Sequence, residues 1–274
     1  MIENLVFASG GIYGISFMGA YAFLVKHNLL NEVKCYSGCS AGAIFAVLAN
    51  LALSIEEIET IIDGLDYEKF SDINFLDINS KLGFESGKKI MDHIKEIIRQ
   101  KTEVLDITFN ELYLKTGKKL YINAVCLTDN KIEYFSIDNA PDMPVSMALR
   151  MSISIPFIFV PVKYNNKLYV DGGMLEYIPN IFTDNSLIIK ITHTCSTETT
   201  TDPTNLKDYC LKLYLCLFSN LRTTTKPSMN EIDIIIPDMD LLTFSITPRL
   251  RKRLYKYGYR AARLYNTAKS IPLI

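Results

Sequence analysis

Two stretches without a charged residue, 4–25 and 35–55, dominate the first part of this sequence. Each is about as long as the ~20 residues that a membrane-spanning helix needs. Clusters of glycine and serine at residues 9–14 and 37–42 interrupt them, and such clusters break helices. Each stretch is therefore predicted to form a buried strand, a glycine-rich turn and a buried helix, which directs the chain to an α/β fold.

Strand and helix patterns continue to alternate beyond residue 55. This order predicts a mostly parallel sheet with covering helices. No repeat or low-complexity tract divides the chain, so one domain is expected over residues 1–274. The expected strands cover residues 4–8, 33–37, 120–127, 131–136, 167–170, 187–192 and 232–236, and the expected helices cover residues 15–27, 41–53, 55–62, 88–100, 145–154 and 248–268.

Composition and charge exclude several classes of protein. Hydrophobic residues make up 49% of the 274 residues, which provides a sizeable core and rules out a disordered chain. The 29 basic and 30 acidic residues nearly balance, so no nucleic-acid partner is expected. The six cysteines form no C-x-x-C pair, so no metal site is expected.

The N-terminus does not resemble a secretory signal. Glu3 occupies the place of the positive n-region, and no small-residue cleavage site follows the apolar run. Scattered cysteines are typical of a reducing compartment. A cytoplasmic location is therefore expected.

The pentapeptide Gly38-Cys39-Ser40-Ala41-Gly42 reads G-x-S-x-G between a predicted strand and an alanine-rich helix. A serine on such a sharp turn needs small neighbours, and Gly38 and Gly42 provide them. The start of the helix directs unpaired N–H groups at the hydroxyl, which stabilises an alkoxide and a developing oxyanion. Ser40 is therefore the candidate nucleophile.

A nucleophilic serine needs a base, and the sequence offers two candidates near predicted strand ends. The chain has only three histidines, and of these only His193 follows a buried strand. Asp171 follows the apolar strand at residues 167–170, and Gly172 and Gly173 behind it allow a tight turn and close backbone approach. Asp171 could act as the base directly, while an ordinary Asp-Gly turn is the alternative interpretation.

A second glycine-rich loop, Ser9-Gly10-Gly11-Ile12-Tyr13-Gly14, joins the first strand to the first helix. Adjacent glycines expose successive backbone N–H groups, as in an oxyanion hole or an anion nest. A dinucleotide-binding loop is disfavoured, because G-x-G-x-x-G is out of register and no acidic residue ends the second strand.

Together these three elements resemble the patatin-like phospholipases. The resemblance rests on the glycine-rich loop, on the G-x-S-A-G-A elbow and on the D-G-G motif. Two intervening segments, 108–118 and 148–162, resemble the family as well. The resemblance covers about residues 3–180, and residues 181–274 look generic.

The resemblance implies a three-layer α/β/α fold and hydrolysis of fatty-acyl esters through an acyl-serine, by a Ser-Asp dyad without a catalytic histidine. It assigns Ser40 as nucleophile, Asp171 as base, and Gly10 and Gly11 to the oxyanion hole. It implies a lipid substrate at a membrane or micelle surface and no metal or organic cofactor. The remaining motif glycines are Gly14, Gly38, Gly42, Gly172 and Gly173.

Three positions depart from the family pattern. Ser9 replaces the first of three glycines, Tyr13 replaces a usual Arg or Lys, and Glu176-Tyr177 replaces a usual Asn pair. The missing basic residue bears on phosphate or headgroup recognition, whereas both dyad residues are present.

Three functions follow from these observations. The first is a lipid acyl hydrolase, either of phospholipase A type or acting on neutral lipids or lysophospholipids. The second is an inactive relative that binds lipid or another partner, which the altered loop at Ser9 motivates. The third is a serine esterase or thioesterase that uses His193. Substitution of Ser40 and of His193 separates the three.

The segment 241–274 contains no acidic residue and eight basic ones. Its helix is expected to pack an apolar face on the protein and to present a basic flank that favours peripheral membrane association. The expected apolar face is Leu250, Leu254, Tyr257, Ala261, Leu264 and Ala268, and the expected basic flank is Arg249, Arg253, Lys256, Arg260 and Arg263.

Overall fold

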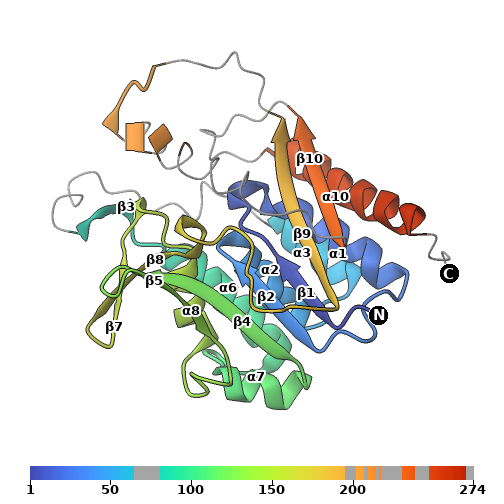
Figure 1. Cartoon of the computed structure of the whole chain (residues 1–274), viewed down its shortest axis with the longest axis horizontal. Helices are drawn as coiled ribbons and strands as arrows, with labels where there is room; N and C mark the ends of the chain where they lie inside the picture. Colours follow the sequence, from blue (N-terminus) through green and yellow to red (C-terminus); the bar gives the residue numbers. More distant parts are fainter. Residues whose placement is uncertain are drawn as a thin grey trace.

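The computed structural model describes residues 1–64, 81–194, 202–206, 209–210, 212–213, 216, 230–237 and 247–269 (Figure 1). For residues 62, 63, 193 and 194 it describes the backbone alone. Both uncharged stretches form the predicted strand, turn and helix. The first comprises β1 (Asn4–Phe7), the 3-10 helix η1 (Gly11–Gly14) and α1 (Ile15–Lys26), and the second comprises β2 (Cys35–Cys39) and α2 (Ala41–Asn50).

The main sheet has eight strands in a mixed, mostly parallel arrangement. Its order is β10-β9-β1-β2-β4-β8-β7, with β5 paired to β4, and the first five strands are parallel to one another. Helices flank this sheet, so the predicted α/β class is confirmed (Figure 1). The other strands are β4 (Lys119–Cys126), β5 (Lys131–Phe135), β7 (Val162–Tyr164), β8 (Lys167–Asp171), β9 (Ser186–Thr194) and β10 (Glu231–Pro237).

One edge of β4 pairs with two different strands in succession. Its first half pairs in parallel with β2 up to Cys39 opposite Asn123, and its second half pairs antiparallel with β8 from Asp171 opposite Ala124. β5 overlaps both partners in register and therefore occupies the other edge. The carboxyl ends of β2 and β8 consequently meet on β4, although the two strands are distant in the sequence.

The helices begin and end at recognisable signals. Ser54 and Glu57 form the predicted capping box before α3, and Thr108 and Glu111 form a second one before α7. Helix α7 was not expected, although this second capping box announces it. The bounds are α3 (Ile55–Gly64), α6 (Lys88–Thr102), α7 (Phe109–Thr116), α8 (Val145–Ser152) and α10 (Pro248–Ala268).

Helices α1 and α10 cross with their backbones in contact. A Cβ atom built on Gly258 would lie 1.8 Å from the carbonyl oxygen of Ser16, and one on Gly19 would lie 1.9 Å from that of Tyr255. Only glycine fits at either position, because any side chain would overlap the facing backbone. The crossing fixes α10 on α1, the helix that follows the glycine-rich loop.

This crossing corrects part of the predicted apolar face of α10. Leu254 is buried and Leu250, Tyr257 and Ala261 pack against the core, as predicted, whereas Leu264 is 56% exposed and Ala268 is exposed as well. The close approach to α1 adds Gly258 and Ala262 to the buried side of the helix. The predicted basic flank is exposed along its whole length.

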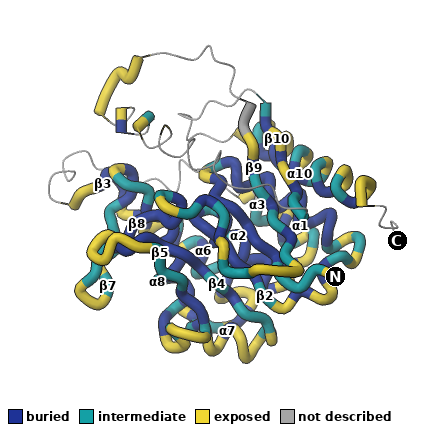
Figure 2. Tube along the Cα trace, in the orientation of Figure 1, coloured by how far each residue is buried: buried dark blue, intermediate teal, exposed yellow. Residues whose placement is uncertain are grey.

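A small second sheet was not predicted. β3 (Gly83–Glu85) and β6 (Phe157–Phe159) pair in parallel, with Gly83 opposite Phe157. Leu82 and Phe157 both have positive φ angles, 63° and 69°, and both are about half exposed. Figure 2 shows exposed chain beside β3, in contrast to the buried central strands β1 and β2. No described helix is long and apolar enough to cross a membrane.

Candidate active site

Ser40 and Asp171 meet where β2 and β8 end against β4. The Ser40 hydroxyl donates a hydrogen bond to Oδ2 of Asp171 over 2.5 Å. Both side chains are buried, at 3% and 0% exposure. The pairing of β2 and β8 with β4 therefore brings together Ser40 of the elbow and Asp171 of the D-G-G motif, which are far apart in the sequence.

The nucleophile elbow depends on its two glycines. Ser40 has a φ of 54°, a strained backbone for a residue with a side chain. A Cβ on Gly38 would lie 2.2 Å from the carbonyl oxygen of Gly42, and one on Gly42 would lie 2.2 Å from that of Ala8. The sharp turn and the packing of α2 against β1 thus require glycine at both positions.

The carboxyl end of α8 holds both members of the pair. The backbone N–H of Ser40 donates to Oγ of Ser152 (2.9 Å), and the N–H of Asp171 donates to the carbonyl of Ser154 (2.9 Å). Arg150 stabilises this end, because its guanidinium donates to Oγ of Ser154 (2.6 Å) and to the carbonyl of Ser86 (2.8 Å). No motif predicted this role, although Arg150 and Ser152 lie in the segment that resembles the family.

Burial decides the protonation of Asp171. Removal of the carboxylate from water raises its pKa to about 7, although hydrogen bonds from the Ser40 hydroxyl and from the Gly173 N–H favour the charged form. The Gly173 bond also fixes the carboxylate, since this N–H donates to Oδ1 over 2.7 Å and leaves Oδ2 for Ser40. A carboxyl with a pKa near neutrality can both accept and return a proton.

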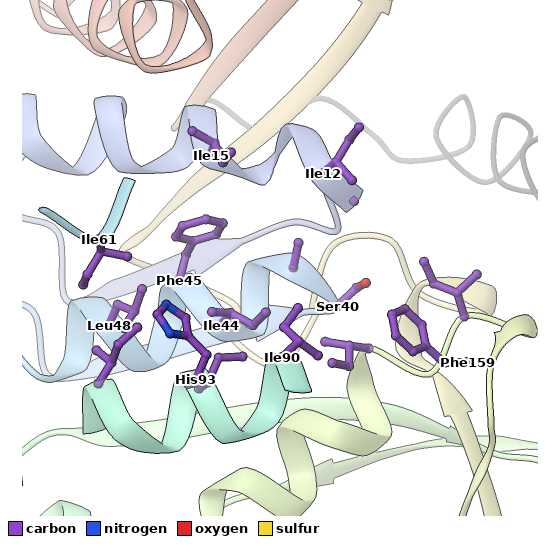
Figure 3. A pocket seen from close by; sticks show the side chains of 16 residues that line it. Ile12, Ile15, Ser40, Ile44, Phe45, Leu48, Ile61, Ile90, His93 and Phe159 are labelled. Carbon is purple, nitrogen blue, oxygen red and sulfur yellow. The ribbon is translucent and has the colours of Figure 1, made fainter. Parts of the chain in front are cut away.

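An apolar cavity of about 180 Å³ begins at Ser40. Helices α2 and α6 supply much of its lining, and Phe159 of β6 lies beside Ser40 (Figure 3). His93 and Leu48 lie at the other end of the cavity (Figure 3). Nine isoleucines line it, namely Ile12, Ile15, Ile44, Ile61, Ile90, Ile94, Ile97, Ile153 and Ile155.

The glycine-rich loop contributes one glycine to this cavity. Gly11, with a φ of 52°, lines it together with Ser40, and a Cβ there would meet no atom within 4 Å. Gly11 is also the first residue of η1, where backbone N–H groups lack helical partners. Gly10 is buried instead, and a Cβ there would lie 2.9 Å from the ring of Phe17.

The comparison with protein families agrees with this arrangement. A family model for patatin-like phospholipases matches residues 5–181, which is more than half of the chain. The chain belongs to the patatin-like phospholipase family. The matched region includes the glycine-rich loop, the elbow and Asp171, and it ends before β9.

Relatives of this patatin-like chain occur in viruses and in Bacillus subtilis. The uncharacterised protein R571 of Acanthamoeba polyphaga mimivirus is 29% identical over 279 residues, covering 96% of this chain and 93% of its own length. The probable lipid hydrolase 463L of Invertebrate iridescent virus 6 is 33% identical over 183 residues, which are 65% of this chain and 61% of that protein. The crystal structure of VipD from Legionella pneumophila superposes with a TM-score of 0.74 at 18% identity, covering 97% of this chain and 67% of VipD.

Two of the departures from the usual patatin-like motifs contact each other. The N–H of Ser9 donates to the carbonyl of Tyr177 (2.8 Å), and the Tyr177 hydroxyl donates to the carbonyl of Ile191 in β9 (2.8 Å). Glu176 accepts hydrogen bonds from Tyr134 and, over 3.4 Å, from the amide of Asn123. The bond between Ser9 and Tyr177 joins backbone atoms and does not depend on either side chain, whereas the Tyr177 hydroxyl adds a side-chain link to β9.

The three histidines of this patatin-like chain lie on or beside three different elements, namely α1, α6 and β9. His93 lines the far part of the cavity, and burial lowers its pKa. His27 follows α1 and contacts the ring of Phe23. His193 lies at the end of β9, paired with Ile236 of β10, and its side chain lies outside the described residues.

One cluster has the residue types of a metal site. The potential ligand atoms of Cys126, Asp129 and Glu133 lie within 4.8 Å of one another on the hairpin of β4 and β5. Lys167 already pairs with Asp129 at 2.7 Å and with Glu133 at 3.2 Å, and Lys131 pairs with both carboxylates. The arrangement is that of an ion-pair network, since both carboxylates are neutralised by lysines.

Proposed function

We propose that this protein hydrolyses fatty-acyl esters of lipids, with Ser40 as nucleophile and Asp171 as base. The observation that carries the proposal is the 2.5 Å contact between the two side chains at the end of an apolar cavity. An isoleucine lining suits an acyl chain, whereas a sugar or nucleotide would leave its polar groups unpaired there. The viral relative described as a probable lipid hydrolase supports the same substrate class.

The proposed acylation step transfers one proton through Asp171. Its carboxylate accepts the hydroxyl proton of Ser40 while Oγ attacks the ester carbonyl carbon. The tetrahedral intermediate then collapses, the bond to the alcohol oxygen breaks, and Asp171 returns the proton to the leaving alcohol. The acyl group is now esterified to Ser40, and its chain occupies the cavity.

Deacylation repeats the same proton transfer with water. Asp171 accepts a proton from a water molecule that attacks the acyl carbon, and it then protonates Oγ of Ser40 as the fatty acid leaves. No step requires a metal or an organic cofactor. We assign the oxyanion to the N–H groups of Gly10 and Gly11, of which Gly11 shares the cavity with Ser40 and Gly10 lies directly before it.

The proposal is tested with a soluble chromogenic acyl ester. Ser40→Ala and Asp171→Asn should each lower kcat about 10⁴-fold or more, and the double variant should lose little further because the two residues act as a unit. Asp142→Asn, which changes an exposed carboxylate, is the control and should keep wild-type turnover. Near-normal turnover of Asp171→Asn would contradict the dyad.

A fluorophosphonate probe separates an enzyme from an inactive lipid-binding relative. The probe should attach to Ser40 of the wild type, as shown by the mass of the peptide that contains it, and should leave Ser40→Ala unlabelled. Absence of both labelling and ester hydrolysis in the folded wild type would favour the binding module.

A further inference from the structure

Helix α10 carries an exposed basic face, defined here as Arg249, Lys252, Lys256, Arg260 and Arg263. All five side chains are exposed, and none pairs with a carboxylate in the described part of the chain. Eight of the 29 basic residues lie in segment 241–274, which has no acid, so 21 basic residues face 30 acidic ones in the rest of the chain. The positive charge is thus concentrated on one helix of an otherwise acidic protein.

The packing of α10 keeps the basic face toward solvent. The backbone contact between Gly258 and Ser16 fixes the rotation of the helix on α1, with Leu254 and Ala262 buried on the same side. A rotation that turned the cations inward would place a side chain against the backbone of α1. The backbone that carries the basic face is therefore already in place, and docking has no backbone segment to order there.

The direction of α10 places the start of the basic face at the same edge of the sheet as Ser40. Its last turns, Ala261 to Lys269, share a surface hollow with Glu231 and Asp233 at the start of β10. The helix therefore runs antiparallel to β10 and begins near its carboxyl end (Figure 1). β10, β9, β1 and β2 are parallel, so this is also the sheet edge at which Ser40 follows β2.

Side chains around the basic face and the cavity fit lipid better than nucleic acid. Tyr255, Tyr257 and Tyr259 are half-buried between the cations, and tyrosine is enriched at the headgroup level of membranes. Leu82 and Phe157 are 57% and 48% exposed on the small sheet whose Phe159 lines the cavity. Apolar side chains displayed in strained backbone positions are typical of a binding surface.

We infer that the basic face of α10 docks this protein on bilayers that contain anionic phospholipid, and that docking brings the Ser40 edge of the sheet to its substrate. The choice of a lipid surface rests on the proposed function, whereas binding itself requires no catalysis. Each exposed cation near an anionic surface strengthens binding several-fold at physiological ionic strength. The attraction falls with added salt, because the interaction is screened.

The test measures co-sedimentation of Ser40→Ala protein with vesicles, so that no lipid is hydrolysed. We compare vesicles of phosphatidylcholine alone with vesicles that contain about one-third phosphatidylserine. Binding is expected only to the anionic vesicles, and 0.5 M salt should release the protein. Equal binding to both compositions, or binding that ignores salt, would overturn the inference.

Charge reversal locates the surface. Lys252→Glu, Lys256→Glu and Arg260→Glu combined should weaken vesicle binding about a hundredfold or more. Lys26→Glu, Lys115→Glu and Lys163→Glu combined change the net charge equally at exposed lysines elsewhere, and should weaken it less than tenfold. Equal losses in the two triple variants would show that only net charge matters, and would contradict docking through α10.

Further controls keep the result interpretable. If the triple reversal unfolds the protein, the corresponding Gln variants remove the charges without adding acids, and a substantial loss is still expected. Tighter binding to duplex DNA than to anionic vesicles would assign the surface to nucleic acid and overturn the lipid proposal.

The triple reversal should hydrolyse the soluble ester normally, so a failure of docking and a failure of the proposed chemistry give different results.

Discussion

The elbow around Ser40 and the glycine-rich loop both depend on glycine, but their glycines meet opposite surroundings. At Gly38 and Gly42 an added Cβ would lie 2.2 Å from a backbone oxygen, whereas at Gly11 it would meet no atom within 4 Å. Glycine in the elbow allows two backbones to touch. Gly11 instead leaves open space in the cavity that Ser40 also lines, where the proposed oxyanion would form.

The largest loss of stability is expected for Gly42→Ala. The new methyl group would force α2 away from the end of β1, and overpacking against a backbone should lower the free energy of unfolding by about 3 kcal/mol or more. Urea unfolding measures this loss. Gly64→Ala, at a helical glycine with no atom within 4 Å, is the matched control and should change stability little. Equal stability of both variants would mean that the elbow is not tightly packed.

The charge of Asp171 should reduce stability at neutral pH. Its folded pKa of about 7 lies above that of an unfolded aspartate, so between about pH 4 and 7 the folded protein keeps a proton that the unfolded chain has lost. The free energy of unfolding therefore falls as pH rises through this window. Asp171→Asn should remove this loss, so that the free energy of unfolding at pH 8 rises by up to about 4 kcal/mol over that of the wild type. Urea unfolding at pH 5 and 8, with Asp142→Asn as the control, measures the gain.

The same pKa predicts the pH profile of the wild type. Asp171 must be ionised to accept the Ser40 proton, so kcat/KM should rise with pH and level off above about 7. A profile that is flat between pH 5 and 8 would contradict Asp171 as the base.

Gly11→Ala should impair chemistry more than stability. The side chain has room, and the positive φ costs only about 1 kcal/mol, but the methyl group enters the cavity beside Ser40. We expect kcat to fall ten- to hundredfold and the unfolding midpoint to change little. The distinction between the two glycine sites fails if Gly11→Ala is as unstable as Gly42→Ala, or if it is fully active.

The smallest effect is expected for His193→Ala. The Ser40 hydroxyl already donates to Asp171, so kcat should change less than about threefold. A collapse of turnover in a variant with wild-type melting temperature would instead identify His193 as the base.

Local signals in the sequence predicted the elements around the site. The strand–turn–helix units, the capping box at Ser54 and Glu57, and helix α10 from Pro248 to Ala268 are all confirmed. These features depend on neighbouring residues, so one sequence can reveal them. The same kind of signal, formed by Thr108 and Glu111, also precedes α7, which the hydrophobic pattern alone does not predict.

Helix packing and strand order depend on residues far apart in the chain, and local sequence patterns did not predict them. The hydrophobic pattern of α10 favoured Leu264, yet the helix buries Gly258, because backbone contact with α1 is better satisfied by a small residue. The placement of β8 beyond β2 on one edge of β4 was equally hidden, since no local pattern records which strands share an edge. The sequence thus named Ser40 and Asp171 without predicting how they meet.

The shared edge of β4 has a consequence for the order in which the molecule acquires activity during folding. Ser40 and Asp171 are separated by 131 positions in the chain, and contacts of such separation form slowly because a long loop must close. A refolding intermediate with β1, β2 and β4 in place would contain the elbow but lack the base until β8 docks. Recovery of ester hydrolysis would therefore report the docking of β8, whereas helix formation, followed by circular dichroism, would precede it.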